Sequence, residues 1–219
     1  MPDPHKTDGD EDEIPATPEE EATAVKPRHA ASLIVLRQPQ SGPQMLMGMR
    51  GSRHKFMPNR LVFPGGAVDP DDLYTEVATK LRPDTRRHLE KSADTALAHG
   101  LGVAASRELE EETNLSFGAP AALDGLHFLC RLVTPPDNAF RFNARFLVID
   151  ADLVTGNLAG SGELEELRFF DMEEALALDL AVPTRQVLQR LKLFLAMSPQ
   201  EQTERRHTPV YQQRQWGFE

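Results

Sequence analysis

Residues 107–115 read Arg-Glu-Leu-Glu-Glu-Glu-Thr-Asn-Leu and place four glutamates and one arginine within six residues. On a helix, residues three and four positions apart share a face, so Glu108, Glu111 and Glu112 form one acidic stripe. Like charges at this spacing repel each other, but a bound hard cation reverses the interaction, because Mg²⁺ and Mn²⁺ prefer carboxylate oxygens. Arg107 lies four residues before Glu111 and can orient its carboxylate. The stripe is therefore either a cation site or the solvated face of a charged helix.

A glycine-rich segment upstream favours the cation site. Residues 63–69 read Phe-Pro-Gly-Gly-Ala-Val-Asp, and the two segments together resemble the Nudix box. In that motif a glycine and then a glutamate precede Arg-Glu-(apolar)-x-Glu-Glu-x-Gly-(apolar). Asn114 stands where the family has glycine, at a helix end where the left-handed conformation makes Asn the next most tolerated residue. The matching residues are Arg107, Glu108, Leu109, Glu111, Glu112 and Leu115.

The spacing between the two segments is longer than usual. Arg107 follows Gly66 by 41 positions instead of the usual 14, so the motif carries an insertion of 27 residues. A split box of this kind, with Phe-Met-Pro at 56–58 just before residues 61–66, resembles the peroxisomal-type coenzyme A diphosphatase branch of the Nudix family and its bacterial relatives. The resemblance covers roughly residues 29–180.

The resemblance implies an α/β fold, the Nudix α/β/α sandwich with a mixed β-sheet and a helical insertion. It also implies metal-dependent cleavage of a diphosphate, with Mg²⁺ or Mn²⁺ held by Gly65, Glu108, Glu111 and Glu112. Glu108 is either a ligand or the general base, and Glu111 and Arg107 complete the expected catalytic set. The expected substrate is a small molecule, coenzyme A or an acyl derivative. The alternatives are ADP-ribose, NADH or a dinucleoside polyphosphate, or a non-catalytic Nudix-like module that senses a nucleotide.

Two groups of basic residues are candidates for contact with the substrate phosphates, since guanidinium and ammonium groups pair with phosphate oxygens. The first group precedes the glycines and is either a phosphate clamp or a solvated basic loop. The second group, in a later strand, either contacts phosphates or flanks the sheet. The residues are Arg50, Arg53, Lys55 and Arg60 in the first group and Arg141 and Arg145 in the second.

Two sets of acidic residues leave alternatives open. The family's glutamate between the glycine and the helix has three possible counterparts, Asp69, Asp71 and Asp72, and the sequence does not choose among them. A further carboxylate near the last strand is sometimes present in Nudix proteins. Its candidates here are Glu163, Glu165 and Glu166, which are otherwise solvated surface residues.

The periodicity of apolar residues predicts the elements. Strands are expected at 29–37, 45–50, 61–63, 126–133, 141–149 and 163–170. Helices are expected at 73–81 and 83–98 within the insertion, at 103–113 for the acidic stripe, from Asp171 to 180 with Asp171 as a cap, and at 183–197. Gly100 and Gly102 are expected to separate the insertion from the acidic helix. The insertion either shapes the substrate pocket or builds a dimer contact.

The charge of the chain is concentrated at its start. The net charge is −10, and residues 1–21 contribute −8 through nine acids and Lys6. Such a segment buries too little apolar surface to order itself. We therefore expect a disordered acidic tail at 1–27, a Nudix domain at 28–199 with its insertion at about 70–100, and a C-terminal tail at 200–219. Aromatic residues of that last tail, Tyr211, Trp216 and Phe218, dock on the body or on a second subunit.

Composition narrows the class of protein. At 219 residues with 40% hydrophobic content, the chain holds one domain of ordinary size. No apolar run approaches the 18 residues of a membrane span, and residues 1–5 do not begin a secretory signal. The single cysteine, Cys130, has apolar flanks and is expected to be a buried structural thiol. We expect a cytoplasmic protein that binds neither membranes nor nucleic acid, and that is either a monomer or a homodimer.

Overall fold

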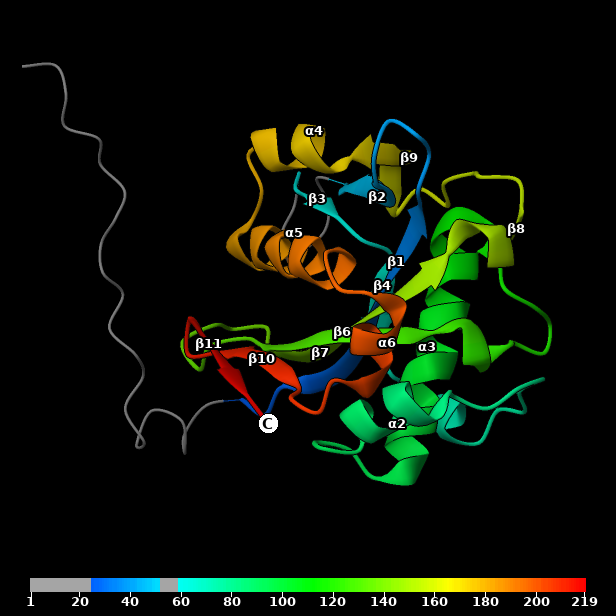
Figure 1. Cartoon of the computed structure of the whole chain (residues 1–219), viewed down its shortest axis with the longest axis vertical. Helices are drawn as coiled ribbons and strands as arrows, with labels where there is room; N and C mark the ends of the chain where they lie inside the picture. Colours follow the sequence, from blue (N-terminus) through cyan, green and yellow to red (C-terminus); the bar gives the residue numbers. More distant parts are fainter. Residues whose placement is uncertain (1–24, 52–58) are drawn as a thin grey trace, which may run out of the picture.

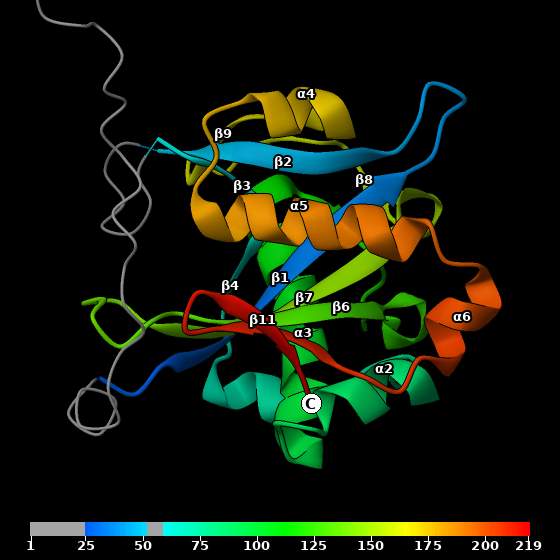
Figure 2. The same cartoon turned by 60° about the vertical axis from the view of Figure 1, so that its left-hand side comes forward.

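The computed structural model describes residues 25–51 and 59–219. The acidic tail predicted at 1–27 therefore lies almost wholly outside the described residues. A mixed sheet has strand order β11-β10-β6-β7-β1-β2-β3, with β4 beside β1 and β9 beside β2. Figures 1 and 2 show α3 and α5 on opposite sides of this sheet. The expected mixed α/β sandwich is confirmed.

The strands are β1 (Arg28–Arg37), β2 (Gln44–Arg50), β3 (Leu61–Val62), β4 (Gly65–Ala67), β5 (Leu115–Ser116), β6 (His127–Val133), β7 (Phe142–Asp150), β8 (Thr155–Gly156), β9 (Leu164–Asp171), β10 (Pro209–Gln212) and β11 (Gln215–Phe218). The α-helices are α2 (Pro83–Leu89), α3 (Thr95–Thr113), α4 (Met172–Ala177), α5 (Val182–Leu195) and α6 (Pro199–Glu204). Three short 3₁₀ helices are η1 (Pro70–Leu73), η2 (Leu123–Gly125) and η3 (Ala151–Leu153).

Strand β1 is the centre of the sheet because both of its faces are apolar. It runs parallel to β7 and antiparallel to β2 and β4. Leu33 and Val35 join the core cluster that contains the buried side of α3. Ile34 and Leu36, which point to the other face, join the cluster that contains the buried side of α5. Strand β1 is thus buried on both faces, which explains its nearly continuous apolar sequence.

The helices predicted for the insertion need correction. Residues 73–81 do not form a helix: η1 ends at Leu73, and Thr79 pairs with Ala122 in an isolated bridge. The helix predicted at 83–98 stops at Leu89, and a new helix, α3, starts at Thr95. The cause of the restart is a cap, because the Asp94 side chain accepts a hydrogen bond of 2.8 Å from the Leu97 backbone N–H.

The two glycines expected to end the insertion lie inside α3 instead. A Cβ atom at Gly100 would come within 2.8 Å of Leu73 Cδ2, and one at Gly102 within 3.0 Å of Leu123 Cδ1. Glycine therefore allows the insertion and the η2 segment to pack directly on the helix, at a cost of about 1 kcal/mol per glycine in helix propensity. As a result the acidic stripe sits at the C-terminal end of a 19-residue helix.

The C-terminal residues 200–219, predicted as a tail, also need correction. After α6, strands β10 and β11 form a hairpin, and β10 pairs in parallel with β6 in the main sheet. The expected docking of aromatic residues is present for Trp216. Its Nε1–H donates a hydrogen bond of 2.6 Å to Gln186 of α5, and its ring lies 5.3 Å from that of Tyr211.

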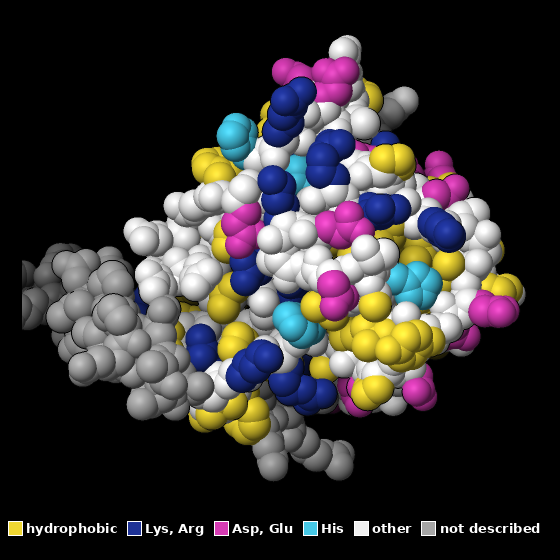
Figure 3. Space-filling view, turned by 90° about the horizontal axis from the view of Figure 1, so that it is seen from below, with side chains coloured by type: hydrophobic (Ala, Val, Ile, Leu, Met, Phe, Trp, Pro, Cys, Tyr) yellow, Lys and Arg dark blue, Asp and Glu magenta, His cyan; other side chains and the backbone are white. Residues whose placement is uncertain are grey.

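Other expectations at the C-terminal half are met in part. Helices α4 and α5 lie where they were predicted, but the Asp171 side chain makes no cap hydrogen bond and instead accepts one from Gln44 Nε2 at 2.7 Å. Cys130 is fully buried, and burial raises the pKa of its thiol. Within the described ranges, none of the helices is long and apolar enough to cross a bilayer. The face that lies at the bottom in Figure 1, near α2, mixes basic, acidic and apolar side chains (Figure 3).

Candidate functional site

The acidic stripe lies on the last turns of α3, beside β4. The helix ends at Asn114, which adopts the left-handed conformation with φ 58°, as expected for the residue that replaces glycine there. Helix α3 and β4 are in close contact, so the glutamates of the stripe meet the backbone of Gly65 and Gly66. The acidic helix and the glycine segment, which the sequence separates by 40 residues, therefore form one site.

Glu112 is the most deeply buried acid of the stripe. It is 2% exposed, and its Oε2 accepts a hydrogen bond of 2.8 Å from the Gly65 backbone N–H. Burial raises the pKa of its carboxyl to about 8, against the opposing effects of the Gly65 hydrogen bond and the charge of Arg50. A nearby positive charge, such as a cation, would lower this pKa again, because it favours the ionised form of the carboxyl.

Glu108 lies directly against Gly66. A Cβ atom built on Gly66 would come within 2.2 Å of Glu108 Oε1, so only glycine leaves room for this carboxylate. Burial also raises the pKa of Glu108, while its hydrogen bond with Arg107 acts in the opposite direction. Two partly desolvated carboxyls therefore meet at the same glycine segment, and each carries the cost of burying a negative charge.

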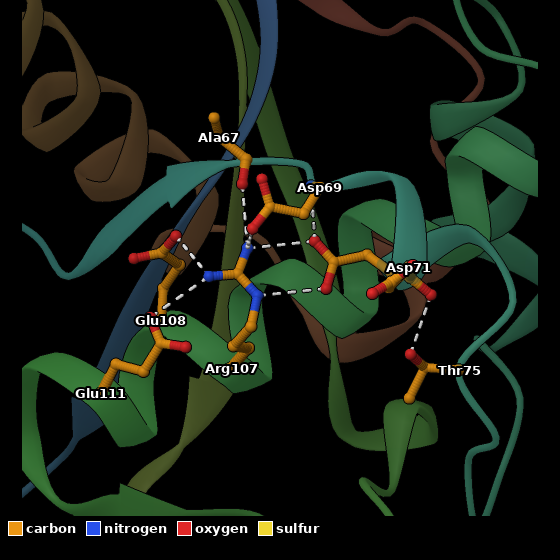
Figure 4. A network of polar contacts seen from close by, with 8 residues as sticks. Ala67, Asp69, Asp71, Thr75, Arg107, Glu108 and Glu111 are labelled. Atoms are coloured by element: carbon orange, nitrogen blue, oxygen red, sulfur yellow. Dashed lines mark hydrogen bonds and ion pairs between the residues drawn. The ribbon is translucent and has the colours of Figure 1, made fainter.

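Arg107 is the centre of the polar network in Figure 4. Its Nε and Nη2 donate to the two carboxylate oxygens of Asp72 at 3.1 and 3.0 Å, and Nη2 also donates to the Ala67 carbonyl at 2.9 Å. Its Nη1 donates to Glu108 at 2.8 Å and to Glu111 at 3.3 Å. These contacts hold the guanidinium in place and raise its pKa further.

The network selects Asp72 among the three aspartates that the sequence left open. Asp72 is buried and makes a bidentate pair with Arg107, and its Oδ2 also accepts a hydrogen bond from the Asp69 backbone N–H at 2.8 Å. The carboxylate of Asp69 is 3.7 Å from the guanidinium, which is outside hydrogen-bond distance. Asp71 contacts Thr75 through its backbone carbonyl. Asp72 is therefore the residue that orients Arg107.

One acid near the last strand is close enough to act on this site. The charge of Glu163 raises the pKa of both Glu108 and Glu112. Glu165 and Glu166 follow on β9 and are exposed. Of the three candidates for a further carboxylate, Glu163 is thus the one that the fold brings near the stripe.

A pocket of about 680 Å³ is lined at one end by the glycine segment, Gly65 and Gly66, and does not include the glutamates of the stripe among its lining residues. Its floor is a row of paired residues that crosses five strands, from β10 through β6, β7 and β1 to β4: Tyr211, Leu132, Ala144, Ala30 and Ala67. Four steps between neighbouring strands, each of about 4.8 Å, make this floor about 19 Å long. Phe63 and Phe146, which meet edge to face, form part of the wall. The pocket is long, largely apolar and open to the glycine segment at one end.

The structure separates the basic residues that were predicted to contact phosphates. Arg50 lines the pocket, and its charge lowers the pKa of Glu112, so it stands between the pocket and the stripe. Arg60 instead pairs with Asp179, and Arg141 donates to the carbonyls of Thr134 at 3.1 Å and Val25 at 2.8 Å. Neither is among the residues that line the pocket. Arg53 and Lys55 lie outside the described residues.

Arg145 is on the wrong face of the sheet for a substrate contact. It is 1% exposed and alternates along β7 with Ala144 and Phe146, which line the pocket. Its guanidinium donates to the backbone carbonyl of Ser92 at 2.8 Å and contacts His29 Nδ1 at 2.9 Å. Burial lowers its pKa to about 10. Because both faces of β7 are buried, the sequence alone could not say which face this arginine occupies.

Two arginines that the sequence analysis did not select do line the pocket. Arg28 starts β1, and Arg214 lies at the turn of the β10–β11 hairpin. Arg28 follows the acidic N-terminal segment, and Arg214 belongs to the predicted tail, so neither stood near a recognisable motif. Only the pairing of β10 with β6 brings Arg214 to the pocket.

Comparison with known proteins supports the fold assignment. No family model and no curated protein matches the chain. Among solved structures, a NUDIX hydrolase from Alicyclobacillus acidocaldarius is similar with a TM-score of 0.59 and 23% identity, over 75% of this chain and 90% of that one. A MutT NUDIX hydrolase from Burkholderia pseudomallei has a TM-score of 0.50 and 20% identity, over 76% and 99%. The MutT protein from Methanosarcina mazei Go1 has a TM-score of 0.50 and 16% identity, over 80% and 100%. At these identities the likeness shows that the chain has the Nudix fold.

Proposed function

We propose that the protein is a metal-dependent pyrophosphohydrolase that cleaves the diphosphate of a nucleoside diphosphate linked to another group. The observation that carries the proposal is the meeting of two partly desolvated carboxyls, Glu108 and Glu112, at the glycine segment that opens the long pocket. Buried acids whose pKa values are raised are frequent at functional sites. The Nudix fold of similar hydrolases supports the same reaction.

The donor set suits a hard divalent cation. Oxygen ligands from Glu108, Glu111, Glu112 and the Gly65 carbonyl are of the kind that Mg²⁺ and Mn²⁺ prefer. As the side chains lie, no three metal-binding side chains converge among the described residues. Glu111 is 58% exposed and turned toward Arg107 at 3.3 Å, and in this proposal its side chain rotates toward Glu108 and Glu112 when an ion binds. A bound ion would neutralise the diphosphate oxygens and lower the pKa of a water molecule.

The residues of the chain then have distinct roles. Arg50 binds the diphosphate from the pocket side, since it lines the pocket and its charge also acts on Glu112. Arg107, fixed by Asp72, positions Glu108. Either Glu108 or Glu111 accepts the proton of the attacking water. The apolar floor of the pocket excludes water from the group attached to the diphosphate, which strengthens the electrostatic interactions at the site.

Coenzyme A or an acyl derivative is the substrate that we propose. The split motif resembles the coenzyme A diphosphatase branch, and a floor of about 19 Å suits a long flexible substrate better than a compact nucleotide. Cleavage of its diphosphate by water would yield 3′,5′-ADP and a phosphopantetheine derivative.

The test is a hydrolysis panel with Mg²⁺ or Mn²⁺ that includes coenzyme A, ADP-ribose, NADH and a dinucleoside polyphosphate. Glu111→Gln keeps the shape of the side chain but removes the charge, and we expect kcat to fall at least about 100-fold. Glu110→Gln is the matched control, because Glu110 is exposed one position away on the same helix, and it should retain activity within about twofold. Hydrolysis of ADP-ribose but not coenzyme A would overturn the substrate assignment. Equal activity of Glu111→Gln and the parent would overturn the metal site, and no hydrolysis of any compound would favour a nucleotide sensor.

A further inference from the structure

The turn of the C-terminal hairpin has an unusual backbone. Gln213 and Arg214 connect β10 to β11, and both have positive φ angles, 50° and 59°. Two-residue hairpin turns of this kind normally carry Asn or Gly, because other residues are strained in the left-handed region. A long charged side chain at the second position is therefore costly for folding. Strain of this sort is found where the surrounding structure or a function maintains it.

The position of the turn relates Arg214 to the pocket. Tyr211, three residues earlier, forms the end of the pocket floor that is farthest from the glycine segment. Arg214 lines the pocket at that end, and its Nη2 pairs with Asp137 Oδ2 at 2.7 Å. Asp137 lies in the β6–β7 connection, so the ion pair directs the guanidinium from the hairpin toward the pocket. The Arg214 side chain is 26% exposed and that of Asp137 is 56% exposed. The pair is therefore open to solvent mainly on the Asp137 side, and Arg214 can donate to a ligand while it stays paired, because a guanidinium carries five N–H donors.

The charged side chains that line the pocket are mostly basic. Among the described residues that line it, three arginines, Arg28, Arg50 and Arg214, stand against one acid, Asp137. Arg50 is at the end near Glu112. Arg28 starts β1, two residues before Ala30 of the floor, so it lies along the side of the floor. Arg50 and Arg214 thus place a guanidinium at each end of a floor that is apolar in between, and Arg28 adds a third at its side.

We propose that Arg214 is a specificity-determining residue that selects substrates with a second anionic group, separated from the diphosphate by roughly 10–20 Å. The inference rests on the proposed function, since it assigns the diphosphate to the end with Gly65 and Arg50. The chemistry recognised is a phosphate or carboxylate, which a guanidinium binds through charge-assisted hydrogen bonds. The second anion is either a phosphate on the nucleoside ribose or a carboxylate at the opposite end of the substrate.

The test compares pairs of ligands that differ in one anionic group. Coenzyme A against 3′-dephospho-coenzyme A probes the ribose phosphate, and succinyl-coenzyme A against acetyl-coenzyme A probes the remote carboxylate. Dissociation constants are measured calorimetrically in EDTA, so that binding is determined without turnover, and hydrolysis is measured separately with Mg²⁺. The parent should prefer the more anionic member of one pair, and Arg214→Gly should reduce that preference about 10- to 100-fold. Arg86→Gln is the control, because it removes an ion-paired arginine that lies on α2 and does not line the pocket, and it should preserve the preference.

Thermal melting separates this role from a structural one. Glycine relieves the left-handed strain, so Arg214→Gly should raise Tm by about 1–4 °C while it reduces ligand selectivity. A lower Tm together with an unchanged preference would make Arg214 a structural residue of the hairpin and overturn the proposal. Equal binding of both members of each pair by the parent would overturn it as well. Selective binding without hydrolysis would instead support the role of Arg214 and count against the proposed enzymatic function.

Discussion

Replacement of Glu112 by glutamine should change how the stability of the metal-free protein depends on pH. Burial raises the pKa of Glu112 from 4.5 to about 8 in the folded protein. A carboxyl with a raised folded pKa is favourable for folding below the unfolded pKa, and this contribution is lost as pH rises toward the folded value. Between pH 5 and pH 8 the parent should therefore lose about 3 kcal/mol of unfolding free energy through this single group. Glutamine does not titrate, so the variant should not show this loss.

The assay is thermal and urea denaturation of parent and Glu112→Gln in EDTA at pH 5 and pH 8. A loss of about 3 kcal/mol corresponds to a fall in Tm of about 6–12 °C for a domain of this size. Glu110→Gln removes an exposed carboxylate from the same helix and should follow the parent at both pH values. Saturating Mn²⁺ should reduce the loss in the parent, because a cation stabilises the ionised carboxylate. Parallel profiles for the parent and Glu112→Gln would refute the reasoning, because they would show that this carboxyl is ionised at both pH values.

Three further substitutions test the geometry around the stripe. Gly66→Ala places a methyl group within 2.2 Å of Glu108 Oε1, and calorimetry should show a loss of at least about 10-fold in Mn²⁺ affinity. Asp72→Ala removes two hydrogen bonds from Arg107 and leaves that charge partly buried, so urea denaturation should show a loss of about 2–3 kcal/mol. Gly100→Ala adds a methyl group 2.8 Å from the leucine that ends η1 and should lower stability by about 1–3 kcal/mol, although alanine has the higher helix propensity. A melting temperature at or above the parent's for Gly100→Ala would contradict this packing.

The parts of the fold that the sequence predicts best are those with one dominant cause. Apolar runs buried on both faces locate β1 and β7, and the i, i+3, i+4 spacing of the glutamates locates the acidic C-terminal end of α3. Asn114 also adopts the left-handed conformation predicted for it. In each case, local chemistry alone determines the conformation, and no knowledge of the neighbours in space is needed.

The predictions that the structure corrects concern residue types that can serve more than one structural or chemical role. The sequence predicts breaks at Gly100 and Gly102 because glycine lowers helix propensity. In the structure both lie inside α3, where a Cβ atom would come within 2.8 Å of Leu73 and 3.0 Å of Leu123. For Arg145 the sequence leaves open a phosphate contact or a place flanking the sheet, and the structure buries it on the face of β7 opposite the pocket. The C-terminal hairpin is short and polar, and its pairing with β6 depends on residues more than 70 positions away. In each case, the role of the residue depends on which residues surround it in the folded protein, and the sequence does not show these neighbours.

The insertion separates the two halves of the motif in the sequence, but the fold brings them back into contact. Asp72 and Arg107 are 35 residues apart, yet they form the bidentate pair that fixes the Arg107 side chain beside Glu108. The intervening chain leaves from η1, forms α2, and returns as the first turns of α3, where Gly100 lets η1 pack against the same helix. The two ends of the insertion meet because η1 packs against α3, the helix that carries the acidic stripe. Packing, and not a short connection, therefore holds them together. We therefore expect the site to tolerate changes in the length of the insertion better than the replacement of Asp72 or Arg107 alone, because each replacement leaves the other partly buried charge without its partner.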